Sequence, residues 1–330
     1  SDNWEDIMEV LDKKGGLLLQ ASAGNGKTYV AKQIAKKLME KGYGVKIIAP
    51  TNKAGLNIGG STIHKFLKID KEGNISSKLL KIIKEKYQYI IIDEISMIGK
   101  ELWKRINLLK INSNIKFLLL GDEKQCPPVE NEDIEDYFNH PAVKSICNYN
   151  RNVLDVRKRY DEKLYNILED VNNIKIDYAH AIKEPLTERN ICYYNKTRKR
   201  INKYWNDKKK NDKDLFIPAD EENDKTQDMY IYEGLPVIAM KTKHDGDNIL
   251  FANSETFNVG NIDNEYISLC CERPDENGEK EMYIYDCLIE DFRDYFLLNY
   301  CSTTHKSQGE TITEEYTIYD WDGMTTKIKY

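Results

Sequence analysis

The sequence predicts an α/β protein whose first half forms a doubly wound parallel sheet, and three features carry this prediction. The apolar run Leu17–Leu19 leads through a turn of small residues into a helical pattern. Two more apolar runs, Tyr89–Ile92 and Phe117–Leu120, are each followed by acidic residues. Strands that are apolar on both faces and alternate with helical or loop segments are typical of parallel sheets covered by helices.

The turn after the first apolar run has the form of a phosphate-binding loop. Gly24 and Gly26 let successive backbone N–H groups point at an anion, at the N-terminus of a helix. Lys27 can then reach the β- and γ-phosphates, and Thr28 can place its hydroxyl on Mg²⁺. The pattern GxxxxGK[ST] has alanine where it asks for the first glycine, and an ordinary glycine-rich turn is the alternative interpretation. We expect a nucleotide site made by Ala23, Gly24, Asn25, Gly26, Lys27, Thr28 and Tyr29.

Acidic and amide side chains follow the next two buried strands. The strand over Tyr89–Ile92 ends in Asp93 and Glu94, and the carboxyl ends of parallel strands are where α/β proteins bind ligands. We expect Asp93 to hold Mg²⁺ through water and Glu94 to orient and deprotonate the attacking water. A solvated strand end is the alternative for this motif alone. Gln125, after the following strand, can sense the γ-phosphate without a change of charge.

The other elements of the first half follow in chain order. Residues 1–16 are expected to form a helix, and Val45–Pro50 a second strand. Residues 65–86 are expected to form a small insertion with a helix from Ser76 onward. No glutamine precedes Gln20, so the residue that recognises adenine is not visible.

Composition limits the class of protein. The chain has 330 residues, of which 40% are hydrophobic and 32% charged, which favours two or more globular domains. The acidic start has no apolar signal region, and no apolar run approaches the ~18 residues of a membrane span, so we expect an intracellular protein. The net charge of −6 restricts a nucleic-acid site to a local groove. The seven cysteines lack metal-ligand spacing and indicate reduced thiols, with no metal expected beyond Mg²⁺.

Six further motifs follow one another along nearly the whole chain. They are APTNKA at 49–54, GGSTIHKF at 59–66, IIDEISM at 91–97, GDEKQCPPV at 121–129, LDVRKRYD at 154–161 and TTHKSQGET at 303–311. In this order they resemble the motifs of superfamily 1B helicases, the branch that contains RecD, Dda and the Pif-type enzymes. The motif at 154–161, the fourth of the family, and the segment Ile191–Arg198 are most similar to those of helicases from large nucleocytoplasmic DNA viruses.

The resemblance implies two RecA-like domains, residues 1–160 and 161–330, with ATP and Mg²⁺ held between them. Lys27, Thr28, Asp93, Glu94 and Gln125 would grip the nucleotide from the first domain. The resemblance also implies that Arg159 reaches the γ-phosphate and that Gly309 and Thr311 line the pocket from the second domain.

The same resemblance implies that single-stranded DNA crosses both domains and that the protein moves along it from 5′ to 3′. Short β-type runs between Tyr230 and Asp286 predict a small barrel. The resemblance implies an SH3-like insertion at about 230–290 that closes over the single-stranded DNA. The chain is expected to return to the sheet of the second RecA-like domain over Phe292–Thr303. The implied strand contacts are Thr51, Lys53, Thr62, His64, Asn195, Thr197, Thr303 and His305, with Phe66 as a stacking candidate.

The densest basic run, Lys196–Lys210, contains Tyr204 and Trp205. A solvated helix face is the usual origin of such a run. We favour phosphate contact because Asn195 and Thr197 lie where the resemblance places strand contacts.

These observations predict an ATP-dependent DNA helicase or translocase that acts, as a monomer, on single-stranded DNA and on duplex junctions, in the cytoplasm, the nucleus or a viral replication site. Two alternatives stay open: an RNA helicase of the same superfamily, and a phosphate-loop ATPase that is a nucleotide-gated binding module without unwinding. A nucleotide kinase gives no reason for His64. The family's sixth motif, with its arginine finger, does not occur before Tyr330, so we expect a truncated chain that hydrolyses ATP slowly.

Overall fold

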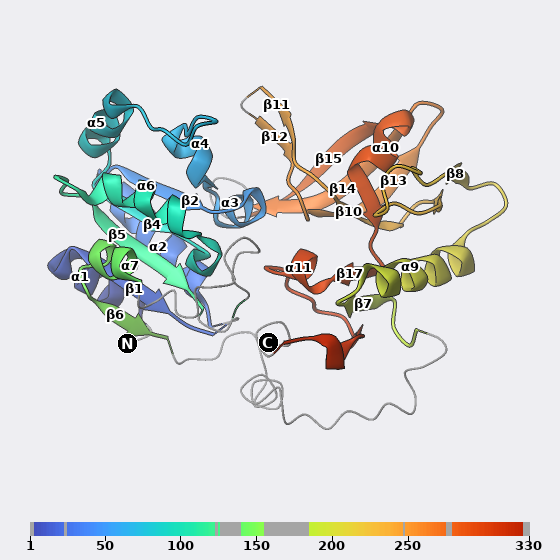
Figure 1. Ribbon diagram of the computed structural model, residues 1–330, viewed down its shortest axis with the longest axis horizontal. Helices are drawn as coiled ribbons and strands as arrows, with labels where there is room; N and C mark the ends of the chain where they lie inside the picture. The colour runs from blue at the N-terminus through green and yellow to red at the C-terminus, as the bar shows by residue number, and fades with distance from the viewer. Residues whose placement is uncertain are drawn as a thin grey trace. The chain divides into compact units, whose positions relative to one another are not determined.

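The computed structural model describes residues 3–22, 25–122, 125, 140–154, 185–246, 248–274 and 279–325 (Figure 1). The chain divides into two compact units, with the boundary between residues 172 and 173. The expected boundary at 160/161 and the predicted Arg159 lie outside the described residues.

The first unit is built on a six-stranded parallel sheet in the order β3-β2-β4-β5-β1-β6. Because all pairings are parallel, the carboxyl ends of the strands lie at one edge of the sheet. The phosphate-binding loop after β1 and the acidic residues after β4 and β5 are therefore at the same edge. The predicted strands are confirmed with small shifts. The bounds are β1 Gly16–Gln20, β2 Val45–Ala49, β3 Ser61–Thr62, β4 Tyr89–Ile92, β5 Lys116–Gly121 and β6 Arg151–Val153.

Helices cover both faces of this sheet, as the alternation along β1 requires. Leu17 and Leu19 pack in one buried cluster with residues of α1 and α2, whereas Leu18 points to the other face and packs with residues of α6 and α7. The α5 helix begins where the sequence predicts, because the Ser76 hydroxyl accepts from the backbone N–H of Leu79. The helices are α1 Trp4–Lys14, α2 Lys27–Glu40, α3 Asn52–Ile58, α4 Ile63–Leu67, α5 Ser77–Lys86, α6 Lys100–Lys110 and α7 Pro141–Ile146, with a 3₁₀ turn, η1, at Ile95–Met97.

The second unit contains a three-stranded parallel sheet in the order β17-β7-β18. The α9 helix, which carries the basic run, packs against this sheet with Ile201 and Trp205 buried. The elements are β7 Arg189–Cys192, α9 Asn195–Lys209, β17 Cys301–Thr303, α11 Thr304–Ser307, β18 Tyr316–Ile318 and the 3₁₀ turn η4 Trp321–Gly323; a separate ribbon is formed by β8 Leu215–Ile217 and β9 Met229–Ile231.

An antiparallel region fills the chain between β9 and β17. Its five-stranded sheet has the order β15-β14-β13-β10-β16, and β11 and β12 form a separate hairpin. The short strands predicted here are therefore confirmed as an antiparallel sheet, while the SH3-like assignment stays a prediction. The bounds are β10 Pro236–Ala239, β11 Lys243–Asp245, β12 Asn248–Phe251, β13 Thr256–Ile262, β14 Tyr266–Pro274, β15 Lys280–Leu288, α10 Ile289–Tyr295 and β16 Phe296–Leu298.

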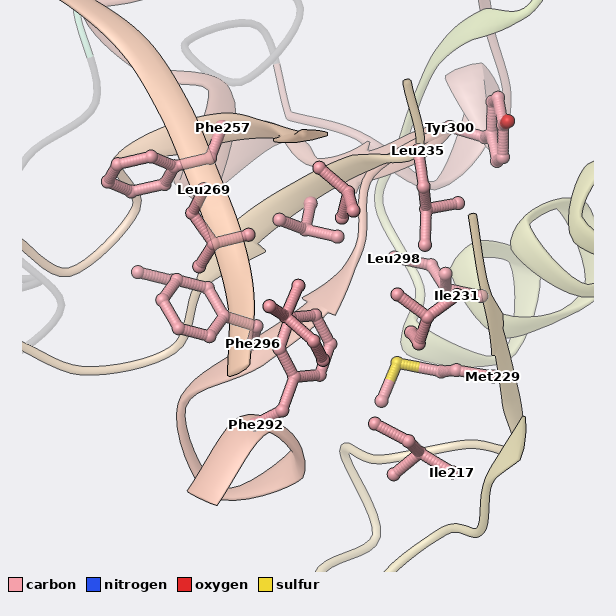
Figure 2. Packing of buried hydrophobic residues seen from close by; sticks show 14 of the residues in the cluster. Ile217, Met229, Ile231, Leu235, Phe257, Leu269, Phe292, Phe296, Leu298 and Tyr300 are labelled. Carbon is pink, nitrogen blue, oxygen red and sulfur yellow. The ribbon is translucent and has the colours of Figure 1, made fainter. Parts of the chain in front are cut away.

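The expectation that the chain returns to the parallel sheet from Phe292 onward is wrong for the first part of that segment. Phe296 begins β16, which pairs with β10 of the antiparallel sheet. Figure 2 shows the reason: Phe292 and Phe296 point into the apolar core beside Phe257, with the Phe292 and Phe296 ring centroids 5.3 Å apart. Only at Cys301, in β17, does the chain join β7. None of the described helices has the length and apolar character that crossing a bilayer requires.

Candidate nucleotide and nucleic-acid sites

The described part of the phosphate-binding loop has the backbone that this role requires. Gly26 has φ 84°, in the left-handed region that glycine adopts without strain, and it directly precedes α2. Lys27, the first residue of α2, donates through Nζ to the carbonyl oxygens of Ala21 at 2.5 Å and Ser22 at 3.2 Å. The ammonium group therefore folds back over the loop at a helix N-terminus, where an anion binds. Ala23 and Gly24 lie outside the described residues.

Thr28 and Asp93 bring two oxygen ligands together at the sheet edge. The Thr28 hydroxyl donates to Oδ2 of Asp93 across 3.4 Å, a long hydrogen bond. The position of Asp93 is fixed by its backbone N–H, which donates to the carbonyl oxygen of Ile48 at the end of β2. Burial raises the pKa of the Asp93 carboxyl. A hydroxyl and a carboxylate side by side are the hard oxygen donors that suit Mg²⁺.

Glu94 has the properties of a general base near neutral pH. Burial, and then the neighbouring charge of Asp93, raise the pKa of Glu94 to about 7, while Lys27 and Lys53 oppose the rise and Asp122 adds to it. Within the described residues, Glu94 Oε2 is buried without a hydrogen-bond partner. Its backbone φ of 54° is unusual for glutamate, and such conformations concentrate at functional sites.

Gln125 and two further residues complete the described surroundings of this edge. Gln125 is half-buried, and its backbone N–H donates to the carbonyl oxygen of Asp122. Asp122 and Lys32 were not predicted as site residues. Asp122 is buried and directly follows β5, just as Asp93 directly follows β4. Burial lowers the pKa of Lys32, and the charge of Asp93 opposes this shift. Lys32 lies one helical turn after Thr28, on the same face of α2, and this spacing in the sequence could have indicated that Lys32 belongs to the site.

The two threonines predicted as strand contacts in the first unit cap helices. The Thr51 hydroxyl accepts from the backbone N–H of Ala54 at the start of α3, and the Thr62 hydroxyl accepts from that of Lys65 at the start of α4. Each hydroxyl keeps its own proton, so each can still donate to a phosphate oxygen. His64 is exposed on α4.

Phe66, the predicted stacking residue, is half-buried against the core of the first unit. Its ring meets that of Tyr87 edge-on at 5.7 Å, and the ammonium group of Lys46 lies 5.5 Å from the ring centroid. These contacts give Phe66 a packing role in the structure.

In the second unit, Asp320 organises the segment that carries two predicted strand contacts. Oδ2 of Asp320 accepts from the backbone N–H groups of Tyr193 and Tyr194, and Oδ1 accepts from the Thr197 hydroxyl at 2.9 Å. Asn195 is the first residue of α9, and its side-chain oxygen accepts from Nε of Arg198. Asp320 lies more than a hundred positions along the chain from these partners, and nothing local in the sequence signals its role.

Thr303 and His305 lie at the same edge of the parallel sheet. Thr303 is opposite Cys192 in the register of β17 and β7, so it ends beside the segment that leads to Asn195. His305 is exposed on α11. The parallel register therefore brings the predicted strand contacts of this unit to one edge.

The loop at Gly309–Thr311 is held by an ion pair with a buried arginine. Gly309 has φ 78° and is exposed, as is Thr311. Between them, the Glu310 carboxylate forms an ion pair with the buried guanidinium of Arg189, which also donates to the backbone and side-chain oxygens of Asn299. The predicted role of Gly309 and Thr311 at a nucleotide stays a prediction.

The basic run is only partly a surface feature. Arg198 is buried and donates to the carbonyl oxygen of Lys225 at 2.6 Å. Lys208 and Lys209 lie over the ring of the buried Trp205, at 4.9 and 5.8 Å from its centroid. In the first nine residues of α9, the exposed cations are Lys196, Arg200 and Lys203. Within the described residues no group of three or more His, Cys, Asp or Glu side chains could hold a metal.

Comparison with known proteins agrees with this arrangement. The family model of an AAA domain matches residues 5–144. The ATP-dependent DNA helicase PIF1 of Candida albicans is 27% identical over 203 residues, which are 52% of this chain and 22% of that protein. The helicase dda of Enterobacteria phage T4 is 29% identical over 188 residues, or 52% of this chain and 41% of that protein. The matches thus span less than half of these relatives' length.

Solved structures extend the similarity over both units. A crystal structure of the Pif1 helicase from Candida albicans has a TM-score of 0.65 at 20% identity, covering 96% of this chain and 88% of that one. A Pif1 helicase from Bacteroides, solved with ADP-AlF3 and single-stranded DNA, has a TM-score of 0.61 at 18% identity, covering 96% and 86%. These matches show that the chain has the fold of two RecA-like domains.

Proposed function

Because the chain belongs to superfamily 1B of the helicases, we propose that it hydrolyses ATP to move along single-stranded DNA and to open duplexes. The observation that carries this proposal is the convergence of Lys27, Thr28, Asp93 and Glu94 at one sheet edge. The strands that lead to Thr51 and Thr62 end at that edge too. Relatives named as ATP-dependent DNA helicases support the choice of DNA.

We propose one task for each side chain of the nucleotide site. Lys27 exchanges the carbonyl oxygens of Ala21 and Ser22 for phosphate oxygens when ATP enters. Thr28 and Asp93 would hold Mg²⁺, which would neutralise part of the phosphate charge. Glu94 accepts a proton from the attacking water, since its carboxylate is poised to gain a proton near pH 7. Gln125, Arg159, Gly309 and Thr311 are proposed to act at the γ-phosphate and the pocket wall on the strength of the motif resemblance alone.

The strand contacts are proposed to be made with the DNA backbone. Hydroxyl and basic groups that bind phosphates fix the register of a strand and carry no sequence information. In the first unit the proposed groups are Thr51, Lys53, Thr62 and His64. In the second unit they are Thr303, His305 and the amide of Asn195, together with Thr197, whose hydroxyl donates to Asp320 in this structure and reaches a phosphate only by leaving that carboxylate. Movement from 5′ to 3′ by a monomer is part of the proposal.

Strand displacement tests the proposal. A fluorescent duplex with a 5′ single-stranded tail should be opened in the presence of ATP and Mg²⁺, and one with a 3′ tail should not. Glu94→Gln, which keeps the shape of the side chain, is the matched inactive control. Opening only of RNA-tailed substrates favours the RNA helicase alternative. ATP hydrolysis without opening of either tailed duplex, and without stimulation by single strands, favours the binding module.

A further inference from the structure

We propose that the rings of Tyr193 and Tyr194, together with the imidazole of His305, form a platform on which bases of single-stranded DNA stack. This inference rests on the proposed function; to His305, which the motif resemblance already assigns to the strand, it adds Tyr193 and Tyr194, which the resemblance does not assign. The Tyr193 and Tyr194 ring centroids are 5.0 Å apart with the planes at 62°, so these two rings meet edge-on and present separate faces to separate bases. The Tyr193 and His305 centroids are 6.4 Å apart with the planes inclined by 33°. Tyr194 is 52% exposed, His305 is exposed and Tyr193 is half-buried.

Asp320 and Gly323 position the two tyrosines. The backbone N–H groups of Tyr193 and Tyr194 donate to one carboxylate oxygen of Asp320, at 3.1 and 3.0 Å. The ring of Tyr194 lies so close to Gly323 that a Cβ there would be 2.7 Å from the phenol oxygen. Aromatic rings fixed before binding lose little conformational entropy when a base arrives. Gly323 therefore leaves the space that Tyr194 needs.

The position of the platform suits a single strand. It follows β7 at the carboxyl edge of the parallel sheet, where Thr303 lies opposite Cys192 and Asn195 opens α9. The exposed cations Lys196 and Arg200 belong to the first two turns of the same helix. Stacking rings for bases combined with cations for phosphates is the arrangement by which proteins bind single strands without sequence preference.

Other aromatic side chains near the predicted DNA path are engaged elsewhere. Phe66 packs into the core of the first unit against Tyr87 and Lys46. Trp205, inside the basic run, is buried and packs with Tyr204 and Tyr300. The tyrosines before α9 are thus better placed for a base than Phe66, the stacking candidate from the motifs, or the buried Trp205.

Equilibrium binding to a fluorescent oligothymidylate tests the platform. Tyr193→Ala and Tyr194→Ala should each weaken binding by roughly 5- to 150-fold if the ring carries a stacked base. Tyr193→Phe and Tyr194→Phe should bind as the wild type does. The slope of log K against log salt should not change, because the variants keep every cation that meets a phosphate. Phe216→Ala removes an aromatic ring that is 47% exposed and packs on Tyr230 in the same unit, and is the matched control.

A strand of abasic sites separates stacking from every other contact. The wild type should prefer the oligothymidylate, and the alanine variants should lose that preference. If an alanine variant has a lowered thermal midpoint, Tyr194→Leu keeps the apolar bulk without the aromatic face and should also lose the preference. Unchanged affinity in all variants, or loss confined to a shallower salt slope, overturns the platform while leaving the proposed function intact. A wild type that binds no single strand overturns both.

Discussion

The Thr28 hydroxyl and the Asp93 carboxylate, 65 positions apart in the sequence, meet across 3.4 Å at the carboxyl edge of the parallel sheet. The first turn of α2 supplies the hydroxyl, and the residue after β4 supplies the carboxylate. The two nucleotide motifs thereby form one site within the first unit. The acid-base chemistry of that site follows from the residue next to Asp93.

Hydrolysis should depend on the protonation of Glu94. Because the general base must be deprotonated, the rate constant should rise with pH and level off above about 7, the pKa of Glu94. The positive charge of Lys53 lowers this pKa, so Lys53→Ala should raise it and move the rising limb to higher pH. Lys53→Arg keeps the charge and should restore the wild-type profile. Steady-state ATPase rates from mildly acidic to mildly alkaline pH make the comparison. A profile that does not move in Lys53→Ala removes Lys53 from the electrostatics of the base.

Substitutions of Thr51 should separate its structural role from its role in binding the DNA strand. Thr51→Ala removes the cap of α3 and should lower the free energy of unfolding by about 1 kcal/mol. Thr51→Asp retains a capping oxygen but adds a negative charge, so it should keep stability and weaken binding to single strands. Thr51→Ser should preserve both. Chemical denaturation and strand titration of the same three variants give the two readouts. Equal strand affinity in the Asp and Ser variants would mean that no phosphate lies near this cap.

The pair of Arg189 and Glu310 should be a large contributor to the stability of the second unit. Both side chains are largely buried, so Arg189→Ala leaves the Glu310 carboxylate without its cation and should cost about 3–5 kcal/mol. Glu310→Gln keeps an acceptor and should cost less. The exposed pair Lys13 and Glu9 offers the control, since Glu9→Ala should cost no more than about 1 kcal/mol. Denaturant midpoints measure all three. Comparable losses for the buried and the exposed pair would contradict this assignment.

The basic helix should divide into residues that bind DNA and residues that hold the fold. Replacing Lys199 and Arg200 together by alanine should make the salt dependence of single-strand binding shallower, by about 0.7 for each phosphate that the variant no longer neutralises. Arg198→Ala should instead destabilise the unit, because the buried guanidinium donates to the carbonyl oxygen of Lys225. The two variants should therefore affect different measurements. The double variant should alter the salt slope, and Arg198→Ala should lower the thermal midpoint. An unchanged slope would leave Lys199 and Arg200 as plain surface.

Features that depend on local pattern could be predicted from the sequence. The phosphate-binding loop, the strand ends at Asp93 and Asp122 and the start of α5 after Ser76 are each written in consecutive residues, so periodicity and capping chemistry locate them. The burial of Arg198 was readable too, since it lies on the helical face of Ile201, Asn202 and Trp205. The basic composition of the run outweighed that signal.

Features that depend on tertiary contacts could not be predicted. Asp320 binds the backbone of Tyr193 from a distant part of the chain, and no spacing rule connects the two. A threonine in a binding motif and a threonine at a helix N-cap have the same sequence appearance, so the cap at Thr51 became visible only in the structure. Phe296 pairs with the antiparallel sheet because the core around Phe257 and Phe292 accommodates its ring, a property of packing and not of local pattern.

The most direct test of the central claim is the ATPase rate with and without saturating single-stranded DNA. The wild-type chain should hydrolyse ATP faster with the strand than without it. Lys27→Ala should abolish both rates, because the loop then lacks its ammonium group, while Lys36→Ala, an exposed position on the same helix, should leave them unchanged. A wild-type rate that is indifferent to the strand, or a Lys27→Ala variant as active as the wild type, would contradict an ATP-driven, DNA-stimulated motor built on this loop.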